Sequence, residues 1–462
     1  MGFTDKTINE LINTQFECSC GRTHIANIEN IAIGPGAIEK LPEFLETQKL
    51  ADGRIFDKNK DLIFIVSDVN TEKAAGADVT KRLEAGGFKI AKYVLPHPQM
   101  HSEEQFVDEI NDHLPEEVQL LIAVGSGSVN DMTRFVSFKK GVPYYIVGTA
   151  PSMDGYASNV SPIVHNNLKI TYPAHCAAAI IGDTDYLATA PMHMIAAGLG
   201  DVLGKYLAIS DWKLSQIING EYCCPEVCEL VLYSVEKCVA TIDDLKARDP
   251  QALTYLIESL VLIGIAMSFI GNSRPASSSE HHISHFLEMK AIQSGEYGEL
   301  HGTDVGMATC MIGQMYDEFL ENGIDYDKAR EHAKAFDHDT WVSEIKRCFG
   351  PGATEVIKLY ETARQNDSDE VLRRITAIEA NEDAVLDQIR SVRQDLAKCP
   401  VLLEELGGLT DPSSYPFSAG EMTDIITYAK DLRNRYGTLQ VFYDLGVLEP
   451  LAADTADRYM KK

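Results

Sequence analysis

The stretch Val118-Gln-Leu-Leu-Ile-Ala-Val124, followed at once by Gly125-Ser-Gly-Ser128, decides the fold. Its nearly unbroken apolar run is typical of a strand that is buried on both faces of a parallel sheet. The glycines and serines end this strand abruptly, and residues 129–139 have the composition of a helix. A buried strand, a tight turn and a helix form the repeating unit of an α/β nucleotide-binding domain.

The same unit recurs on both sides of this stretch. Further strands are predicted at residues 28–36, 61–68, 88–95 and 142–148, and helices at residues 37–47, 71–87 and 102–113. Residues 160–172 predict a β-hairpin with a His165-Asn-Asn turn. The expected fold class of this half is therefore α/β, with a Rossmann-like parallel sheet.

Helical periodicity dominates the chain after Pro191. Helices are predicted at residues 196–214, 225–246, 252–270, 280–291 and 302–318. A chain of 462 residues is too long for one ordinary core. We therefore predict an α/β domain at residues 1–190 and a helical domain at residues 191–462. The charged segment 368–398 predicts a solvated surface helix or pair of helices.

The composition excludes several classes of partner. The formal net charge is −28 and the pI is about 4.8, so the surface repels nucleic acid and anionic membranes. The most apolar run, residues 260–270, is shorter than the roughly 20 residues that span a bilayer. No apolar leader is visible, and ten unevenly spaced cysteines suggest reduced thiols. We expect a cytoplasmic protein without membrane insertion.

The stretch Arg274-Pro-Ala-Ser-Ser-Ser-Glu-His-His-Ile-Ser-His285 carries the strongest chemical signal. Ser277 and Glu280 have capping-box spacing, which predicts that a helix begins there. His281 and His285 then share one helix face, whereas His282 faces away and is expected to be packed or exposed. Two imidazoles on one face, with a histidine and an aspartate from elsewhere, are what a metal site requires.

Two loops predict a nucleotide site. Gly125-Ser-Gly-Ser-Val129 would bring backbone N–H groups and a helix N-terminus to a diphosphate, although a tight turn without ligand has the same composition. The polar loop from Thr149 to Ser158 follows the next strand, so both loops could line one cofactor. Asp68 ends an earlier strand, where it either accepts from a ribose 2′-OH or only caps that end.

Cys18-Ser-Cys20-Gly-x-x-His24 allows two interpretations. It has the form of half a zinc site, but it also suits a polar hairpin ahead of the first strand. No second Cys/His pair follows nearby, so the hairpin is the favoured interpretation.

Several motifs in one order resemble a known superfamily. Gly198-x-Gly-Asp201, Ser279-Glu-His281-x-x-Ser-His285 and His301-Gly302 resemble those of the dehydroquinate synthase-like and iron-containing alcohol dehydrogenases. Within that superfamily, the stretch from Arg274 to His285 is most similar to glycerol-1-phosphate dehydrogenases. The resemblance extends from about residue 20 to residue 315.

The resemblance implies an N-terminal nicotinamide-cofactor domain and a C-terminal helical metal and substrate domain. It implies reversible reduction of dihydroxyacetone phosphate to glycerol 1-phosphate with NAD or NADP. The metal ligands would be Asp201, His281 and His301. The residues acting on substrate would be Asp201, His285 and Asp154. The cofactor contacts would be Gly125, Ser126, Gly127, Ser128, Val129, Thr149, Ala150, Pro151, Ser152 and Ser158.

Two departures from the family pattern matter. Ser126 stands where the family has the middle glycine of a triplet. Lys205 stands where iron-type enzymes carry a fourth ligand, a histidine, and an ammonium group cannot bind metal. Three ligands and an open position favour zinc or nickel over iron. Lys205, with Arg274 or Lys290, would supply the positive charge that a phosphorylated substrate needs.

Three other interpretations stay open at this point. One is a dehydrogenase of another small polyol or phosphorylated alcohol. Another is a carbocyclising lyase of the dehydroquinate synthase kind, against which Asp201 argues because such enzymes carry glutamate there. The last is a non-catalytic cofactor-binding protein. In each case the expected partner is a small molecule, and a homo-oligomer of two or more chains is expected.

Overall fold

The structure is a computed structural model that describes residues 2–165 and 168–460. It divides into two compact units. The first contains Met1–Val202 and Glu229–Asn272, and the second contains Leu203–Cys228 and Ser273–Lys462. Two of the three divisions fall inside the continuous helices α8 (Met192–Asn219) and α9 (Pro225–Val239), so each of these helices belongs to both units.

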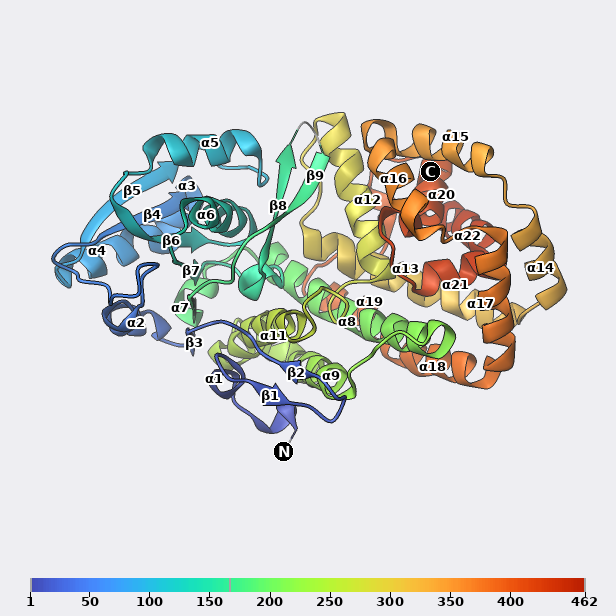
Figure 1. Cartoon of the computed structure of the whole chain (residues 1–462), viewed down its shortest axis with the longest axis horizontal. Helices are drawn as coiled ribbons and strands as arrows, with labels where there is room; N and C mark the ends of the chain where they lie inside the picture. Colours follow the sequence, from blue (N-terminus) through green and yellow to red (C-terminus); the bar gives the residue numbers. More distant parts are fainter. Residues whose placement is uncertain (1, 166–167, 461–462) are drawn as a thin grey trace. The chain divides into compact units, whose positions relative to one another are not determined.

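The first unit is built on a six-stranded parallel sheet (Figure 1). Its strands lie in the order β3 (Asn30–Gly34), β10 (Ala179–Asp183), β7 (Tyr144–Gly148), β6 (Val118–Gly125), β4 (Leu62–Asp68) and β5 (Lys89–Leu95). Every neighbouring pair is parallel. The predicted α/β class is confirmed, and the central strand is the stretch that begins at Val118.

Strand β10 was not predicted, because residues 159–185 were assigned only a hairpin. The hairpin is present as β8 (Val160–His165) and β9 (Leu168–Pro173), while its turn at Asn166 and Asn167 lies outside the described residues. The five residues of β10 pair with β3 on one side and β7 on the other. This strand is thus defined by partners far away in the sequence, which a local pattern does not reveal.

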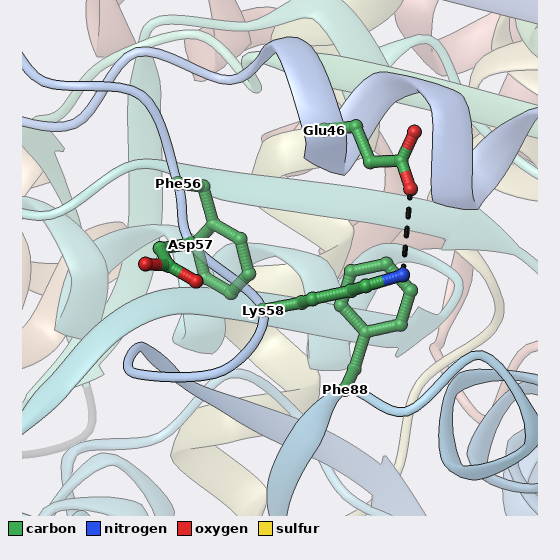
Figure 2. Close-up of a pocket in the computed structure, with 5 residues that line it drawn as sticks. All are labelled: Glu46, Phe56, Asp57, Lys58 and Phe88. Atoms are coloured by element: carbon green, nitrogen blue, oxygen red, sulfur yellow. Dashed lines mark ion pairs between the residues drawn. The ribbon is translucent and has the colours of Figure 1, made fainter.

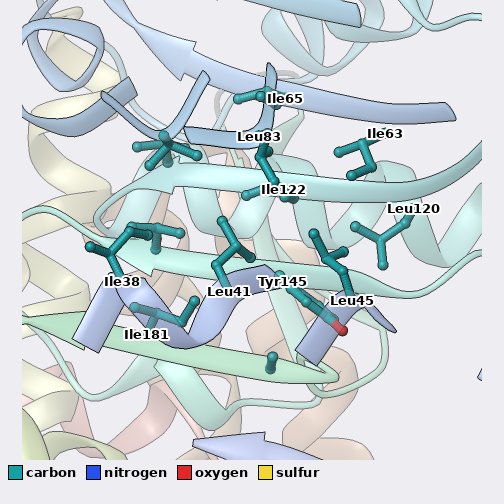
Figure 3. Close-up of a cluster of buried hydrophobic side chains, with 14 of the residues drawn as sticks. Ile38, Leu41, Leu45, Ile63, Ile65, Leu83, Leu120, Ile122, Tyr145 and Ile181 are labelled. Atoms are coloured by element: carbon teal, nitrogen blue, oxygen red, sulfur yellow. The ribbon is translucent and has the colours of Figure 1, made fainter. Parts of the chain in front are cut away.

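One face of the sheet is covered by α2 (Leu41–Thr47) and α4 (Ala77–Ala85), as Figure 3 shows. Leu41, Leu45 and Leu83 from these helices pack on alternate residues of the strands. The strand residues of this cluster are Ile63, Ile65, Leu120, Ile122, Val124, Tyr145, Val147, Ala179 and Ile181. Each fully buried Leu or Ile contributes about 1.5–3 kcal/mol, so the alternation fixes which face each helix covers.

The remaining elements of this unit are short helices, one long helix and a small hairpin. The predicted helix at 71–87 starts at Val69 and contains a π-helical turn at Glu72–Gly76. The other elements are α1 (Ile8–Leu11), β1 (Phe16–Glu17), β2 (Thr23–His24), α3 (Val69–Thr71), α5 (Glu104–His113), α6 (Gly127–Lys140), α7 (Thr184–Leu187), α10 (Ile242–Lys246) and α11 (Pro250–Ile270).

Helix α11 is the one described helix whose length and composition would suit a membrane span. Of its most apolar window, 67% is buried inside the protein. Leu253, Leu256, Ile257 and Leu260 are all completely buried. We therefore assign α11 as a core helix of the first unit.

The second unit is helical throughout its described residues, which confirms the predicted helical C-terminal region. Its helices are α12 (Ser279–Ser294), α13 (His301–Asn322), α14 (Tyr326–Lys334), α15 (His338–Phe349), α16 (Ala353–Ala363), α17 (Ser368–Ala380), α18 (Glu382–Leu396), α19 (Cys399–Glu405), α20 (Ala419–Tyr428), α21 (Thr438–Asp444) and α22 (Leu448–Met460).

The charged segment 368–398 forms the helix pair α17 and α18. Each helix buries one apolar face, with Ile375 and Ile389 completely covered. Arg374 is also buried and donates to both carboxylate oxygens of Asp444, at 2.7 and 2.8 Å. The pair is thus more than a solvated surface element, because a bidentate ion pair and two apolar faces join it to the helical core.

Candidate active site

Helix α12 presents the predicted histidines, but it begins one residue later than the capping box requires. Its N-cap is Ser278, not Ser277. Glu280 Oε1 accepts the backbone N–H of Ser278 at 2.9 Å, and Ser278 Oγ donates to Asp211 Oδ2 at 2.8 Å. The expected box at Ser277 is wrong, because the helix begins after Ser278, whose own hydroxyl donates to Asp211 on another helix instead of capping α12.

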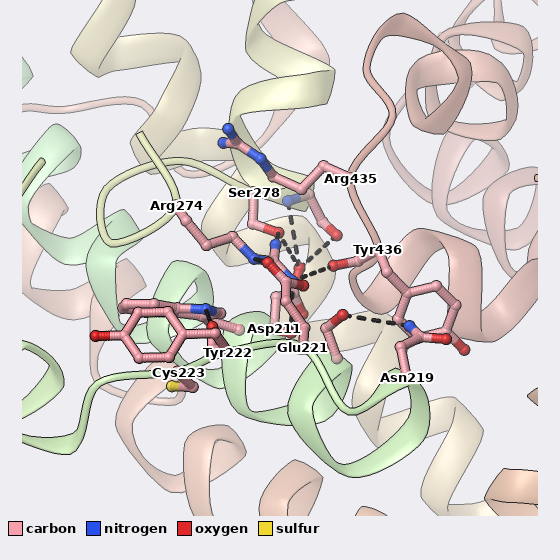
Figure 4. A network of polar contacts seen from close by, with 12 residues as sticks. Asp211, Asn219, Glu221, Tyr222, Cys223, Arg274, Ser278, Arg435 and Tyr436 are labelled. Carbon is pink, nitrogen blue, oxygen red and sulfur yellow. Dashed lines mark hydrogen bonds and ion pairs between the residues drawn. The ribbon is translucent and has the colours of Figure 1, made fainter. Parts of the chain in front are cut away.

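Asp211 on α8 is the centre of this arrangement (Figure 4). Its completely buried carboxylate accepts from Ser278 Oγ and from Ser279 Oγ at 2.6 Å. It also accepts the backbone N–H of Thr438 at 2.9 Å, at the start of α21. One carboxylate therefore fixes the starts of two helices relative to α8. No signal in the sequence singled it out, because Asp201 is a second acidic residue on the same apolar helix.

The guanidinium group of Arg274 lies on the same network and is 3% exposed. It donates to Glu221 at 3.0 and 3.1 Å and to the carbonyl oxygen of Tyr436 at 2.7 Å. Lys290 Nζ donates to the carbonyl oxygen of Cys348 at 2.7 Å. Both cations that the sequence suggested as companions of Lys205 at a substrate phosphate thus bind protein groups.

Two histidines are oriented by neighbouring carboxylates. His281 Nδ1 lies 2.6 Å from Glu280 Oε1, and His301 Nδ1 lies 2.7 Å from Glu288 Oε1. A carboxylate acceptor at Nδ1 places the ring proton there and leaves the Nε2 lone pair for a metal. Burial, with the charge of Lys205 in support, lowers the pKa of His281 well below its usual value. His281 is therefore a neutral imidazole, the form that binds metal.

These side chains form one cluster. The ring centroids of His281 and His301 lie 5.1 Å apart, and the ring of His285 lies 5.9 and 5.4 Å from them. Asp201, His281 and His301 each offer a ligand atom, and these atoms all lie within 4.8 Å of one another. One carboxylate and two imidazoles suit a divalent transition metal, so these three residues fit the ion that the resemblance implies.

Glu288 belongs to the site and was missed by sequence reasoning. It follows His281 by seven residues and His285 by three, so it shares their helix face. Its carboxylate accepts from His301 and lies 3.4 Å from His285 Nδ1. His282 lies away from this cluster, is 2% exposed, and has a strongly lowered pKa because it is buried.

Lys205 is completely buried on α8, one turn after Asp201. Its charge acts on two neighbours, lowering the pKa of His281 and opposing a rise at Glu280. Burial is the larger influence on Glu280, and together with the charge of Asp211 it raises the pKa of Glu280 to about 8. A positive charge is thus held beside the histidines at the position where the iron-type pattern has a fourth ligand.

The two predicted cofactor loops are adjacent in the first unit. Gly125 and Gly148 are register partners at the ends of β6 and β7, and the backbone N–H of Thr149 donates to Gly125 O at 3.1 Å. Ser126 Oγ lies 2.6 Å from Ser152 Oγ and 3.2 Å from Ala150 O. The hydroxyl that distinguishes Ser126 from the family glycine is thus bonded to the second loop.

Close packing explains two of the motif glycines. A Cβ on Gly125 would lie 2.6 Å from Val129 Cβ, at the turn into α6. A Cβ on Gly198 would lie 1.7 Å from Pro151 O, so α8 meets the second loop at backbone distance. The backbone N–H of Asp154 in that loop donates to Asp201 Oδ2 at 2.9 Å. The loop and the predicted metal ligand Asp201 are therefore bonded directly.

The other predicted cofactor residues make local hydrogen bonds. Asp68 Oδ1 accepts the N–H groups of Asn70 and Thr71 at 2.7 and 2.9 Å, so this residue caps α3. Ser128 Oγ donates to Met100 O, and Ser158 Oγ donates to Val160 O, both at 3.1 Å. Asp68 ends β4, the strand next to β6, so it lies at the same edge of the sheet as the Gly125 turn.

A separate surface pocket is lined by Glu46, Phe56, Asp57, Lys58 and Phe88 (Figure 2). Lys58 pairs with Glu46 across it at 3.8 Å. Phe88 precedes β5, and Lys58 precedes β4, so the pocket lies at the amino-terminal edge of the sheet. Ligands of parallel sheets bind at the opposite edge, and we therefore assign no role to this pocket.

Comparison with known proteins agrees with these features. A family model described as iron-containing alcohol dehydrogenase matches residues 32–191. A glycerol-1-phosphate dehydrogenase of Halalkalibacterium halodurans is 34% identical, over 67% of this chain and 76% of that protein. The corresponding proteins of Bacillus subtilis and Pyrococcus horikoshii are each 31% identical, over 67% and 60% of this chain and 77% and 75% of theirs.

Solved structures share the fold at low sequence identity. An alcohol dehydrogenase from an archaeal halo-thermophile of a Red Sea brine pool aligns with a TM-score of 0.58 at 14% identity, over 96% of this chain and all of that one. Glycerol dehydrogenase from Schizosaccharomyces pombe aligns with a TM-score of 0.54 at 16% identity, over 93% and 91% of the two chains. With a parallel sheet, a helical second unit and this level of identity to enzymes, the chain belongs to the glycerol-1-phosphate dehydrogenase family of NAD(P)-dependent oxidoreductases, within the iron-containing alcohol dehydrogenase superfamily.

Proposed function

We propose that this protein catalyses the reversible NAD(P)H-dependent reduction of dihydroxyacetone phosphate to glycerol 1-phosphate. The observation that carries the proposal is the cluster of Asp201, His281 and His301 with the buried cation Lys205 beside it. A metal ion at this cluster would activate the ketone group of a substrate. The cation beside it would bind the phosphate group of that substrate.

The group expected at the cluster is one divalent ion, which we propose to be zinc or nickel rather than iron. Asp201, His281 and His301 would hold it, and Lys205 removes the fourth ligand of the iron-type pattern. When bound, the nicotinamide cofactor supplies the hydride and the divalent ion polarises the ketone oxygen. Three protein ligands leave the open position that a catalytic site requires.

The protein's own residues would position the substrate and move a proton. Lys205 is the side chain that we assign to the phosphate, because its charge lies close enough to His281 to lower the pKa of that imidazole. His285 is assigned to donate the proton that the ketone oxygen takes up on reduction, because its ring lies beside both His281 and His301. Asp154 and Asp201 would orient the substrate from the bonded loop.

The cofactor diphosphate would lie at the turn from Gly125 to Val129, where the N-terminus of α6 supplies backbone N–H groups. Residues 149–152 and Ser158 would form the other wall. Asp68 uses Oδ1 for its helix cap, and we propose that Oδ2 accepts from the adenosine ribose 2′-OH. Such a contact favours NAD over NADP, because a 2′-phosphate would meet the carboxylate.

The test is steady-state kinetics after the purified protein is stripped of metal and reconstituted with zinc or nickel. We expect NADH oxidation with dihydroxyacetone phosphate and little with dihydroxyacetone, because only the phosphate engages Lys205. Chiral analysis of the product identifies glycerol 1-phosphate. Turnover of unphosphorylated ketones with none of dihydroxyacetone phosphate would overturn the substrate assignment.

A further inference from the structure

We propose that Cys18, Cys20, His24 and Cys224 form a second metal site, which binds a structural zinc ion. The three thiol sulfurs and one imidazole nitrogen all lie within 4.8 Å of one another. In tetrahedral zinc sites, Zn–S distances of about 2.3 Å place sulfurs about 3.8 Å apart, so only a small contraction is needed. The proposal concerns the fold of the N-terminal segment and does not depend on the proposed function.

A short hairpin brings the first three ligands together. β1 and β2 pair antiparallel with Phe16 opposite His24. The connecting turn is closed by hydrogen bonds from Cys18 N to Arg22 O at 3.1 Å and from Gly21 N to Cys18 O at 3.0 Å. Because the turn doubles the chain back, both thiols and the imidazole lie at one end of the hairpin.

His24 is already held in the form that binds a metal. Its Nδ1 lies 2.8 Å from the carbonyl oxygen of Phe269, so Nδ1 carries the proton and donates it there. Nε2 then keeps its lone pair and lies 3.3 Å from Cys20 Sγ. The ring is 1% exposed and stacks on Phe269, with centroids 5.6 Å apart. A second partner that fixes the tautomer is the usual support of a metal-binding histidine.

Cys224 supplies the fourth ligand at the residue before α9, and its side chain is completely buried. None of the ten cysteines, all of them in the described part of the chain, forms a disulfide. Three thiolates and one imidazole are soft and borderline ligands that select zinc over magnesium or manganese. Four protein ligands close the tetrahedron, so the site is structural rather than catalytic.

The surroundings explain why an ion would be needed there. β1 and β2 have two residues each, which is too short for a hairpin that is stable alone. The segment packs through Phe3 and Phe16 on Phe269 of α11, with ring centroids 5.1 and 5.9 Å apart. A zinc ion bound to the hairpin would stabilise the packing of this segment on α11, as structural metals do in domains with a small hydrophobic core.

Cobalt substitution of the full-length protein tests the site directly. Thiolate ligands give Co²⁺ an intense sulfur-to-metal charge-transfer band, which a site of carboxylate and imidazole ligands cannot give. We expect this band in the wild type and in His281→Ala, and its loss in Cys20→Ser. Zinc content should fall by one equivalent in Cys20→Ser, and Cys176→Ser, which changes a half-buried thiol of the same unit, should match the wild type.

A further variant shows whether loss of the metal results from loss of a ligand or from misfolding of the protein. His24→Cys keeps four ligands and should retain the metal with a shifted charge-transfer band, whereas His24→Ala should lose it. The proposal is overturned if the band is absent from cobalt-loaded wild type, if Cys20→Ser keeps both band and metal content, or if thiol titration finds these cysteines joined in disulfides. Turnover by Cys20→Ser with the active-site metal present separates this result from any failure of the proposed function.

Discussion

The two proposed metal sites of this molecule differ in their ligands and in what orients them. At Asp201, His281 and His301, the histidine Nδ1 atoms face the carboxylates of Glu280 and Glu288. At the N-terminal cluster, three thiols accompany His24, whose Nδ1 faces a backbone carbonyl. A carboxylate partner raises ligand basicity and a three-ligand set stays open, which suits catalysis. A carbonyl partner and four ligands suit a closed structural site.

The largest effect on turnover is expected from loss of an open-site ligand. His281→Ala or His301→Ala should abolish metal binding at the cluster and lower kcat below detection, because two protein ligands cannot hold the ion. Metal analysis and NADH oxidation measure both effects. His282→Ala on the same helix is the control and should retain the metal. Full activity in metal-free His281→Ala protein would show that the cluster of Asp201, His281 and His301 is not a catalytic metal site.

Removing a carboxylate partner should weaken the open site without destroying it. Glu288→Gln leaves His301 with a neutral acceptor, so metal affinity should fall by roughly 10–100-fold. Competition with a chelator measures the affinity, and Glu296→Gln, at an exposed residue just after α12, is the control. An unchanged affinity would show that the carboxylates do not set the properties of the open cluster.

Lys205→Met tests whether the open cluster is specialised for a phosphorylated ketone. Loss of a charge-assisted contact of about 1.4 kcal/mol should raise KM for dihydroxyacetone phosphate roughly tenfold, with a smaller change in kcat. The matched control is Lys290→Met, whose ammonium binds the carbonyl of Cys348. Equal kinetics in Lys205→Met and wild type would exclude Lys205 from phosphate recognition.

Asp68→Ala should have a smaller effect, confined to the choice of cofactor. Without the carboxylate, the ratio of kcat/KM for NADH to that for NADPH should fall several-fold, because the 2′-phosphate is no longer repelled. The substitution also removes a helix cap worth about 1 kcal/mol. Asp68→Ser preserves the cap, so a shared change of ratio in both variants assigns the effect to the ribose contact, and an unaltered ratio counts against it.

The closed cluster should matter least to turnover and most to stability. Cys20→Ser should leave kcat with the reconstituted active-site metal unchanged, while lowering the midpoint of thermal unfolding. Differential scanning calorimetry with and without a chelator measures the effect, since chelation should destabilise the wild type more than the variant. If Cys20→Ser has wild-type stability but no turnover, the N-terminal cluster is needed for catalysis and not for stability, which contradicts its assignment as a structural site.

Local patterns in the sequence predict most of the strands and helices of the first unit. The apolar composition of buried strands such as 118–124 predicts them directly, and the order of the motifs indicates the family. Non-local features were not accessible in this way. β10 is defined by strands β3 and β7 on either side, and Asp211 is revealed only by the helix starts that it holds.

The same limit explains the N-terminal motif. The sequence favours a polar hairpin for Cys18, Cys20 and His24 because no second Cys/His pair lies nearby, and this hairpin is present. The remaining thiol, Cys224, comes from a distant part of the chain. Position likewise separates the roles of two cations that are both buried. Arg274 and Lys205 look alike as basic residues, and only the structure separates one bound to Glu221 and Tyr436 from one set beside His281.

The contact of Gly198 with Pro151 has a thermodynamic consequence. The loop from Thr149 to Ser152 lies at backbone distance from α8, and the N–H of Asp154 is bonded to Asp201. Under the proposed function, ordering this loop around the cofactor would also order Asp201, the proposed metal ligand, so the two binding equilibria would be linked. By reciprocity, each ligand would then change the affinity for the other by the same factor, and we expect a side chain at Gly198, which would clash with Pro151, to weaken this coupling.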